Sequence, residues 1–283
     1  MEEKLIYANE IGQSIEISHS SSFFLEKYEG LGAIKNLLYT QKSINQSGVN
    51  IVGESLDIRN IIIEGSIVFT SKEDILEAKR NMIKALNPTL KGYLYYELGD
   101  FKKKIACKVE SAPFPHVDSK YKKFLINLFC ANPFWQDIDV IGSEIETLIG
   151  GKSWPFSFPV RFATRGEPIK NIINDGDIEA PVQIIFKGPA VNPKVTNKST
   201  GEFIKVKRII DIGDTLTINT EFGHKKVEIK RSTGLIENAF NYISLDSTFF
   251  QLKQGDNVIE YSTENELEPQ SVTLKYTNRY LGV

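Results

Sequence analysis

The stretch that most constrains the fold of this chain lies between residues 174 and 257. There, short runs with apolar residues at alternate positions are separated at regular intervals by pairs such as Gly-Asp, Gly-Pro and Thr-Gly. Alternation with a period of two is typical of strands that bury one face, and these pairs are typical of tight turns. About eight short strands within roughly 110 residues, among them residues 203–211 and 249–252, predict a two-sheet antiparallel sandwich.

The first half of the chain has a different pattern, in which strands surround one helix. Apolar residues at helical spacing predict a helix over residues 71–86, with Thr70 or Ser71 as its N-cap and Asn87-Pro88 as its end. The stripe expected to pack on a sheet includes Ile83. Strands are predicted, by alternation or by dense β-branched residues, over residues 4–8, 15–17, 57–70, 93–98, 101–110 and 121–130.

Two connections in this half are predicted from turn chemistry. Gly99-Asp100 between two alternating runs indicates a two-residue hairpin. Residues 40–53 are polar and rich in Gly, Ser and Asn, which predicts a long exposed loop. The fold class is therefore mainly β, or β-rich α+β.

The length of 283 residues predicts two domains. We expect an α+β domain over residues 1–138, a docked joint over residues 139–173 and a β-sandwich over residues 174–283. The joint is expected to be docked because apolar residues alternate between its proline and glycine turns.

Charge and cysteine content exclude several classes of protein. The chain has 34 basic and 36 acidic residues, and the two signs are nearly balanced in each half, so a strongly basic nucleic-acid-binding module is not expected. No apolar run approaches the ~20 residues of a membrane-spanning helix, and no classical secretion signal precedes the first strand. Cys107 and Cys130 lie within apolar or alternating runs, which favours two buried free thiols over one disulfide.

The usual signatures of catalysis are missing from the sequence. His19, His116 and His224 are far apart and lack metal-ligand spacing. No GxSxG elbow is present, and no Gly-Lys-Ser/Thr follows a glycine loop. We therefore expect neither a hydrolase nucleophile nor a nucleotide or metal cofactor.

Two carboxylate pairs could support a glycosidase, since acid-base catalysis needs paired carboxyl groups. Asp175 and Asp177 flank Gly176, and Asp211 and Asp214 lie on either side of Gly213. Aspartates beside turn glycines commonly bond their own backbone, so turn chemistry is the favoured interpretation. A calcium loop at residues 175–177 stays open, although it lacks the run of oxygen ligands that such a loop needs.

A sugar-binding sandwich is the alternative function. Carbohydrate sites on β-sandwiches usually present an exposed aromatic platform, but Trp135 and Trp154 both precede the expected sandwich. A carbohydrate-binding adhesin or lectin-like module is therefore the second hypothesis.

The order of short motifs resembles the distal tail (Dit) protein family of long-tailed phages and phage-tail-like particles. In the first half, Arg59 precedes IIIEGSIVF, followed by ALNP, GYLYYE and NPFW. In the second half come FPVRF, NDGDIEAPVQIIFKGPAVNPKVTN, TGEF, GDTLTIN and TFFQLKQGDNVI. The resemblance covers nearly the whole chain, and the order of motifs is more specific than any one of them.

This resemblance implies a split-barrel-like N-terminal domain that assembles into a hexameric ring and a galectin-like C-terminal sandwich. It implies a non-enzymatic baseplate hub at the virion tail tip, assembled in the cytoplasm of the bacterial host. Its partners would be further copies of itself, the tail tube protein and the tail-associated hub proteins, with no nucleic-acid recognition, membrane insertion or cofactor. Candidate ring or tube contacts are the hairpin tip and the proline-rich turn, at Gly99, Asp100, Phe101, Lys102, Lys103, Pro113, Phe114 and Pro115.

Overall fold

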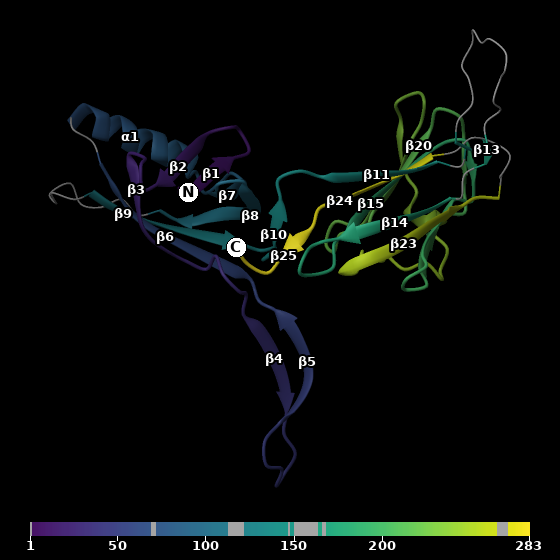
Figure 1. Cartoon of the computed structure of the whole chain (residues 1–283), viewed down its shortest axis with the longest axis horizontal. Helices are drawn as coiled ribbons and strands as arrows, with labels where there is room; N and C mark the ends of the chain where they lie inside the picture. Colours follow the sequence, from purple (N-terminus) through teal and green to yellow (C-terminus); the bar gives the residue numbers. More distant parts are fainter. Residues whose placement is uncertain are drawn as a thin grey trace. The chain divides into compact units, whose positions relative to one another are not determined.

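The computed structural model describes residues 2–68, 72–112, 122–146, 148–149, 164–165, 168–264 and 271–283. The chain forms two compact units (Figure 1). Unit 1 comprises Met1–Ile138 with Tyr280–Val283, and unit 2 comprises Asp139–Arg279.

A closed β-barrel forms the body of unit 1. Its strands follow the order β8-β7-β1-β2-β3-β6-β9, and β9 pairs back with β8, so the sheet closes and its edges disappear. The β2–β3 pair is parallel and the other barrel pairs are antiparallel. The barrel strands are β1 (Glu3–Asn9), β2 (Ser14–Ser18), β3 (Phe23–Glu29), β6 (Arg59–Ile67), β7 (Gly92–Leu98), β8 (Phe101–Ser111) and β9 (Lys122–Cys130).

Alternation in these strands produces the barrel interior. Along β6 and β9, every second side chain points inward, including Ile61, Ile63, Ile126 and Leu128. The β7–β8 hairpin has Leu98 opposite Phe101, which confirms the turn predicted at Gly99-Asp100. Within the strand predicted over residues 57–70, the structure has the single strand β6, and the register between β6 and its partner β3 shifts between Leu25 and Lys27.

Helix α1 (Lys72–Ala85) lies against the barrel, close to β2 and β1 (Figure 1). Ala78, Met82 and Ala85 are buried, whereas Ile83 is exposed, so its predicted place in the buried stripe was wrong. Successive helical residues point about 100° apart, and an inward Met82 therefore turns Ile83 away from the sheet. The N-cap predicted at Thr70 or Ser71 lies outside the described residues.

The loop predicted over residues 40–53 is only partly correct, because residues 42–49 form a loop whereas residues 40–41 and 50–53 are in strands. They belong to a two-stranded hairpin that projects from the barrel, formed by β4 (Asn36–Gln41) and β5 (Asn50–Leu56) (Figure 1). We call residues 36–56 the arm. The prediction of exposure was correct, but the polar composition concealed the strand pairing because neither face of the arm is buried.

Two short strands extend the barrel sheet beyond β8: β10 (Trp135–Asp137) pairs with β8, and β25 (Arg279–Tyr280) follows β10. The C-terminal residues 280–283 thus belong to unit 1 although they are more than 140 residues away from β10 along the chain.

Unit 2 is a β-sandwich with its own apolar core, and this confirms the predicted fold class. One sheet has the order β11 (Ile141–Glu146), β24 (Ser271–Tyr276), β15 (Val182–Lys187), β20 (Thr215–Asn219), β21 (Lys226–Lys230), β22 (Ile236–Asn238). The other has the order β14 (Ile169–Asn174), β23 (Gly255–Ser262), β17 (Lys194–Asn197), β18 (Glu202–Lys205). Smaller elements are β12 (Leu148–Ile149), β13 (Thr164–Arg165), β16 (Ala190–Val191), β19 (Ile209–Ile210) and a 3-10 turn (Phe240–Tyr242).

Two strands expected in the sandwich differ in detail. The run over residues 203–211 is divided between β18 and β19, because Val206 bridges to Ile243 in between. Residues 249–252 form no strand and contribute only an isolated bridge between Leu252 and Ala180.

Candidate functional site

The carboxylate pair at Asp211 and Asp214 is part of an ion-pair network. Asp214 is buried, its Oδ2 lies 2.7 Å from Nη1 of Arg231, and its Oδ1 accepts a hydrogen bond from the Ser232 amide at 2.8 Å. The hydrogen bond from Arg231 lowers the pKa of Asp214 more than burial raises it. A carboxylate stabilised in its ionised form is a poor general acid, so this pair is structural.

The NDGD motif is organised by its asparagine rather than by its aspartates. The buried Asn174 amide donates to the Ile178 and Leu252 carbonyls, and its Oδ1 accepts from the Gly176 amide at 3.0 Å. A side chain at Gly176 would meet backbone atoms of Arg279 at 2.5 Å. The motif therefore marks a close backbone approach, which explains why glycine stands between the two aspartates.

Among the described residues, no group of three or more His, Cys, Asp or Glu side chains could hold a metal ion. His116 lies outside the described residues, as do Pro113, Phe114 and Pro115 of the predicted contact turn. Nor is any described helix long and apolar enough to cross a membrane.

The predicted hairpin tip presents only part of its side chains to solvent. Phe101 is exposed, and Lys102 pairs with Glu97 at 3.1 Å. Lys103 turns inward: its ammonium lies 2.5 Å from a carboxylate oxygen of Asp137 and 3.7 Å from the ring centroid of Tyr280. Lys103 thus contacts Asp137 and Tyr280 of its own unit, and the ring or tube contacts expected of residues 99–103 stay predictions.

A buried arginine, which the resemblance singled out only as a motif residue, joins four distant segments. Arg59 is 4% exposed, and its guanidinium donates only to backbone carbonyls among the partners that the structure describes. Nε donates to Pro133 at 2.8 Å, Nη1 to Gly30 and Gly32 at 2.5 and 2.6 Å, and Nη2 to Leu281 at 2.6 Å. These five residues are the Arg59 cluster.

The backbone around this cluster is equally tight. The Leu31 carbonyl accepts hydrogen bonds from the indole of Trp135 at 3.2 Å and from the amide of Val283 at 3.1 Å. A side chain on Gly282 would lie 2.8 Å from the backbone of Gly32. The C-terminus of the chain is therefore fixed at the base of the arm.

The arm is the most apolar exposed part of unit 1. Within the part of the chain that the structure describes, its two strands pair only with each other, in a sheet of their own. Large apolar side chains are exposed along the arm and just after it, at Leu38, Tyr39, Ile44, Val49, Ile51, Val52, Leu56 and Ile58. Such a concentration of exposed apolar groups marks an interaction surface.

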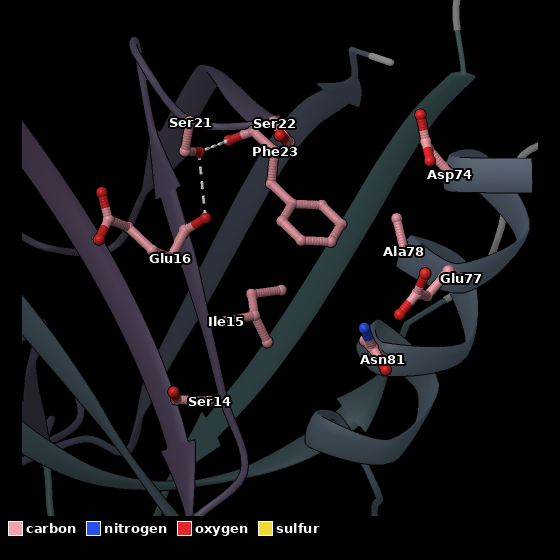
Figure 2. A pocket seen from close by; sticks show the side chains of 10 residues that line it. All are labelled: Ser14, Ile15, Glu16, Ser21, Ser22, Phe23, Asp74, Glu77, Ala78 and Asn81. Atoms are coloured by element: carbon pink, nitrogen blue, oxygen red, sulfur yellow. Dashed lines mark hydrogen bonds between the residues drawn. The ribbon is translucent and has the colours of Figure 1, made fainter. Parts of the chain in front are cut away.

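A cleft of about 580 Å³ lies between α1 and β2 (Figure 2). Ile15, Phe23 and Ala78 give it apolar lining, and Asp74 and Glu77 of α1 add carboxylates, whereas the Glu16 carboxylate points away from the helix. Glu16 pairs with Lys4 at 3.0 Å, which neutralises its charge. The cleft escaped sequence reasoning because its lining comes from three separate elements.

Comparisons with known proteins identify both halves of the chain. A model described as phage tail protein RIFT-related domain matches residues 11–130, and one described as siphovirus-type tail component, C-terminal domain, matches residues 175–280. No curated protein matches this chain.

Solved structures share the fold over the full length. The SPP1 Dit protein, described as a paradigm of the hub of the adsorption apparatus in phages that infect Gram-positive bacteria, has 13% identity and a TM-score of 0.66, with 98% of each chain covered. A chain of the phage P2 baseplate in its activated conformation with Ca has 13% identity and a TM-score of 0.56, with both chains fully covered. With both family models and the whole fold in agreement, this chain belongs to the distal tail (Dit) family of siphovirus-type phage tail components.

Proposed function

We propose that this protein is a structural hub of a phage or phage-tail-like particle, and that it forms a closed hexameric ring joining the tail tube to the tail-tip proteins. The family supports a role in the tail, and the similar solved structures come from an adsorption hub and a baseplate. The proposed role needs no catalysis or cofactor. Its partners are further copies of the chain, the tube protein and the hub proteins at the virion tail tip.

The observation that carries the proposal is the arm. A two-stranded hairpin is at best marginally stable alone in water, and this one buries neither of its faces. Each of its strands also has a free edge, which can pair with another chain. A projecting, apolar hairpin of this kind gains most of its stability from a surface outside its own unit.

A second copy of the chain is the occupant that best fits. When a projecting element contacts a different surface of the next copy, the contact is heterologous, and heterologous contacts close into rings when the rotation permits. The formal net charge of −2 does not oppose self-association. We therefore assign ring formation to residues 1–138. Further candidate contacts with the ring or the tube are Gly99, Asp100, Phe101, Lys102, Lys103, Pro113, Phe114 and Pro115.

The test compares the full-length chain with an arm variant, Leu38→Asp combined with Ile51→Asp. Native mass spectrometry and light scattering, with and without the tube protein, should show a closed ring for the parent and monomers for the variant. Leu245→Asp is the matched control, since Leu245 is fully exposed and lies in unit 2, outside the arm. It should leave the ring intact.

Two outcomes would contradict the proposal. One is a parent chain that stays monomeric and does not bind tube or hub proteins. The other is a ring that forms equally well with the doubly substituted arm. If the full-length monomer instead bound a defined glycan on an array, the adhesin alternative would gain support.

A further inference from the structure

Two thiols lie at the seam where the barrel closes. Strands β8 and β9 pair in antiparallel register, with Lys108 opposite Phe129 and Val109 opposite Leu128. One further step in this register places Cys107 opposite Cys130. Both are free cysteines in the barrel core, 6% and 0% exposed.

The geometry of this pair fits a disulfide. Opposite residues of antiparallel strands have Cα atoms about 4.5–5.5 Å apart, inside the 4.4–6.8 Å range of disulfides. Of the causes that raise the pKa of the Cys107 thiol, a side-chain hydrogen bond with Cys130 is the largest and burial is the second. The chain therefore holds two sulfur atoms together without a covalent link.

The surroundings favour thiol chemistry on the Cys130 side. Arg59 is the direct neighbour of Cys130 in the β6–β9 register. Among the partners described for its guanidinium there is no carboxylate, so the positive charge is not neutralised locally. Burial lowers the pKa of Arg59, and attraction to Cys130 opposes this change. A positive charge therefore lies beside this thiol, and such a setting favours thiol–disulfide exchange.

A buried hydroxyl lies on the other side of the pair. Tyr7 packs on Gly92, the β7 neighbour of Cys107, so closely that a side chain at Gly92 would lie 2.4 Å from the Tyr7 oxygen. That hydroxyl has no hydrogen-bond partner within the described part of the chain. Burial, and secondarily Cys107, raises the pKa of Tyr7 to about 12, so the hydroxyl stays protonated and can donate toward sulfur.

We propose that Cys107 and Cys130 are a modification site that closes to an intramolecular disulfide by exchange with a small disulfide such as oxidised glutathione, cross-linking β8 to β9 at the barrel seam. The Cys130 thiolate attacks one glutathione sulfur, and the other glutathione leaves and takes up a proton. Cys107 then loses its proton and attacks the Cys130 sulfur, which releases the second glutathione. Two protein thiols are oxidised, and one glutathione disulfide is reduced to two thiols.

Burial decides when this reaction occurs. Neither sulfur is accessible in the closed barrel, so exchange requires opening of the β8–β9 seam or takes place during folding. A reducing compartment keeps both thiols free, and an oxidising one allows the cross-link. The cross-link lies within the barrel of one chain, so its formation does not depend on a ring.

The test uses the full-length chain, both native and refolded from denaturant, in buffers of increasing oxidised-to-reduced glutathione ratio. After alkylation, peptide mass spectrometry should show one linked pair of peptides containing Cys107 and Cys130. The oxidised chain should unfold about 5–10 °C above the reduced chain, as expected for a disulfide that closes a loop of roughly 20 residues. Thiols that stay fully alkylatable at the highest ratio after refolding would overturn the proposal, as would exclusively intermolecular links.

Single variants provide the control. Cys107→Ala and Cys130→Ala should each give a glutathione adduct at the remaining cysteine, without the internal link and without the rise in melting temperature on oxidation. Should either variant fail to fold, the linked peptide and the oxidised-minus-reduced melting temperature of the unaltered chain decide the question alone.

Discussion

The arm and the Arg59 cluster are neighbours along the chain, yet they are stabilised in opposite ways. The cluster begins at Gly30 and resumes at Arg59, so the arm is an insertion between two of its segments. Within the cluster, one buried cation satisfies four carbonyls. In the arm, apolar side chains remain in water. The Arg59 cluster therefore stabilises the unit, whereas the arm next to it exposes apolar side chains that a partner can cover.

Removal of the central cation should have the largest effect. Arg59→Ala removes the buried guanidinium to which four part-buried carbonyls are bonded, and we expect the free energy of unfolding of unit 1 to fall by about 3–5 kcal/mol. Calorimetry of the full chain measures this loss, with Arg80→Ala on the exposed face of α1 as the control. A loss below about 1 kcal/mol would show that water replaces the guanidinium without penalty.

The same substitution should change the free energy of unfolding far more in the barrel core than in the arm. Ile61 is 0% exposed in the barrel core, whereas Ile51 is 61% exposed on the arm. We expect Ile61→Ala to lower the free energy of unfolding by about 2–5 kcal/mol and Ile51→Ala to change it by less than about 0.5 kcal/mol. Denaturation of the dissociated chain compares them. Equal losses would mean that the arm packs on its own barrel in solution.

Two glycines test the base of the arm against its tip. Gly30 and Gly48 both have positive φ angles, of 87° and 82°. A side chain at Gly30 would also lie 2.1 Å from the Asn60 carbonyl oxygen, whereas none of the described atoms lies within 4 Å at Gly48. Gly30→Ala should therefore cost about 2–4 kcal/mol and Gly48→Ala only about 1 kcal/mol, measured by thermal unfolding. A larger loss of stability for Gly48→Ala than for Gly30→Ala would contradict this expectation.

Low pH should weaken the Asp214–Arg231 ion pair but not the Arg59 cluster. Arg231 holds the pKa of Asp214 below its ordinary value of 3.8. Because the folded-state pKa is the lower one, this contribution to stability is complete above the ordinary value and disappears as the pH falls through the folded value. Asp214→Asn should lose about 1.5–2 kcal/mol at pH 7 and flatten the dependence of unit 2 stability on pH below 4.

The Arg59 cluster should show no such dependence. Guanidinium and carbonyl groups do not titrate in this range, so the loss caused by Arg59→Ala should be the same at pH 4 and pH 7. Urea titrations of the parent and of Arg59→Ala at pH 4 and pH 7 measure this loss of stability. A loss that shrank in acid would indicate a titrating carboxylate as a partner of Arg59.

Sequence patterns correctly predicted those elements that depend on residues close together in the chain. The helix around Met82, the Gly99-Asp100 hairpin and the inward residues of β9 each follow from spacing within a few residues. The strand residues at 40–41 and 50–53 were missed because a hairpin with two exposed faces has no apolar alternation to reveal it. Ile83 was misassigned because a helix pattern alone does not say which of two adjacent apolar residues faces the sheet.

By itself, the sequence determined the mainly β fold class, the turn positions and the family, because alternation, turn chemistry and motif order are all written along the chain. The tertiary structure was needed to show that the barrel closes through β8 and β9, in a register that places Cys107 opposite Cys130 one step further, and that Arg59 binds the Leu281 carbonyl 222 positions away. The physical reason is that closure and buried hydrogen bonds depend on strand register between distant segments, which no local pattern specifies.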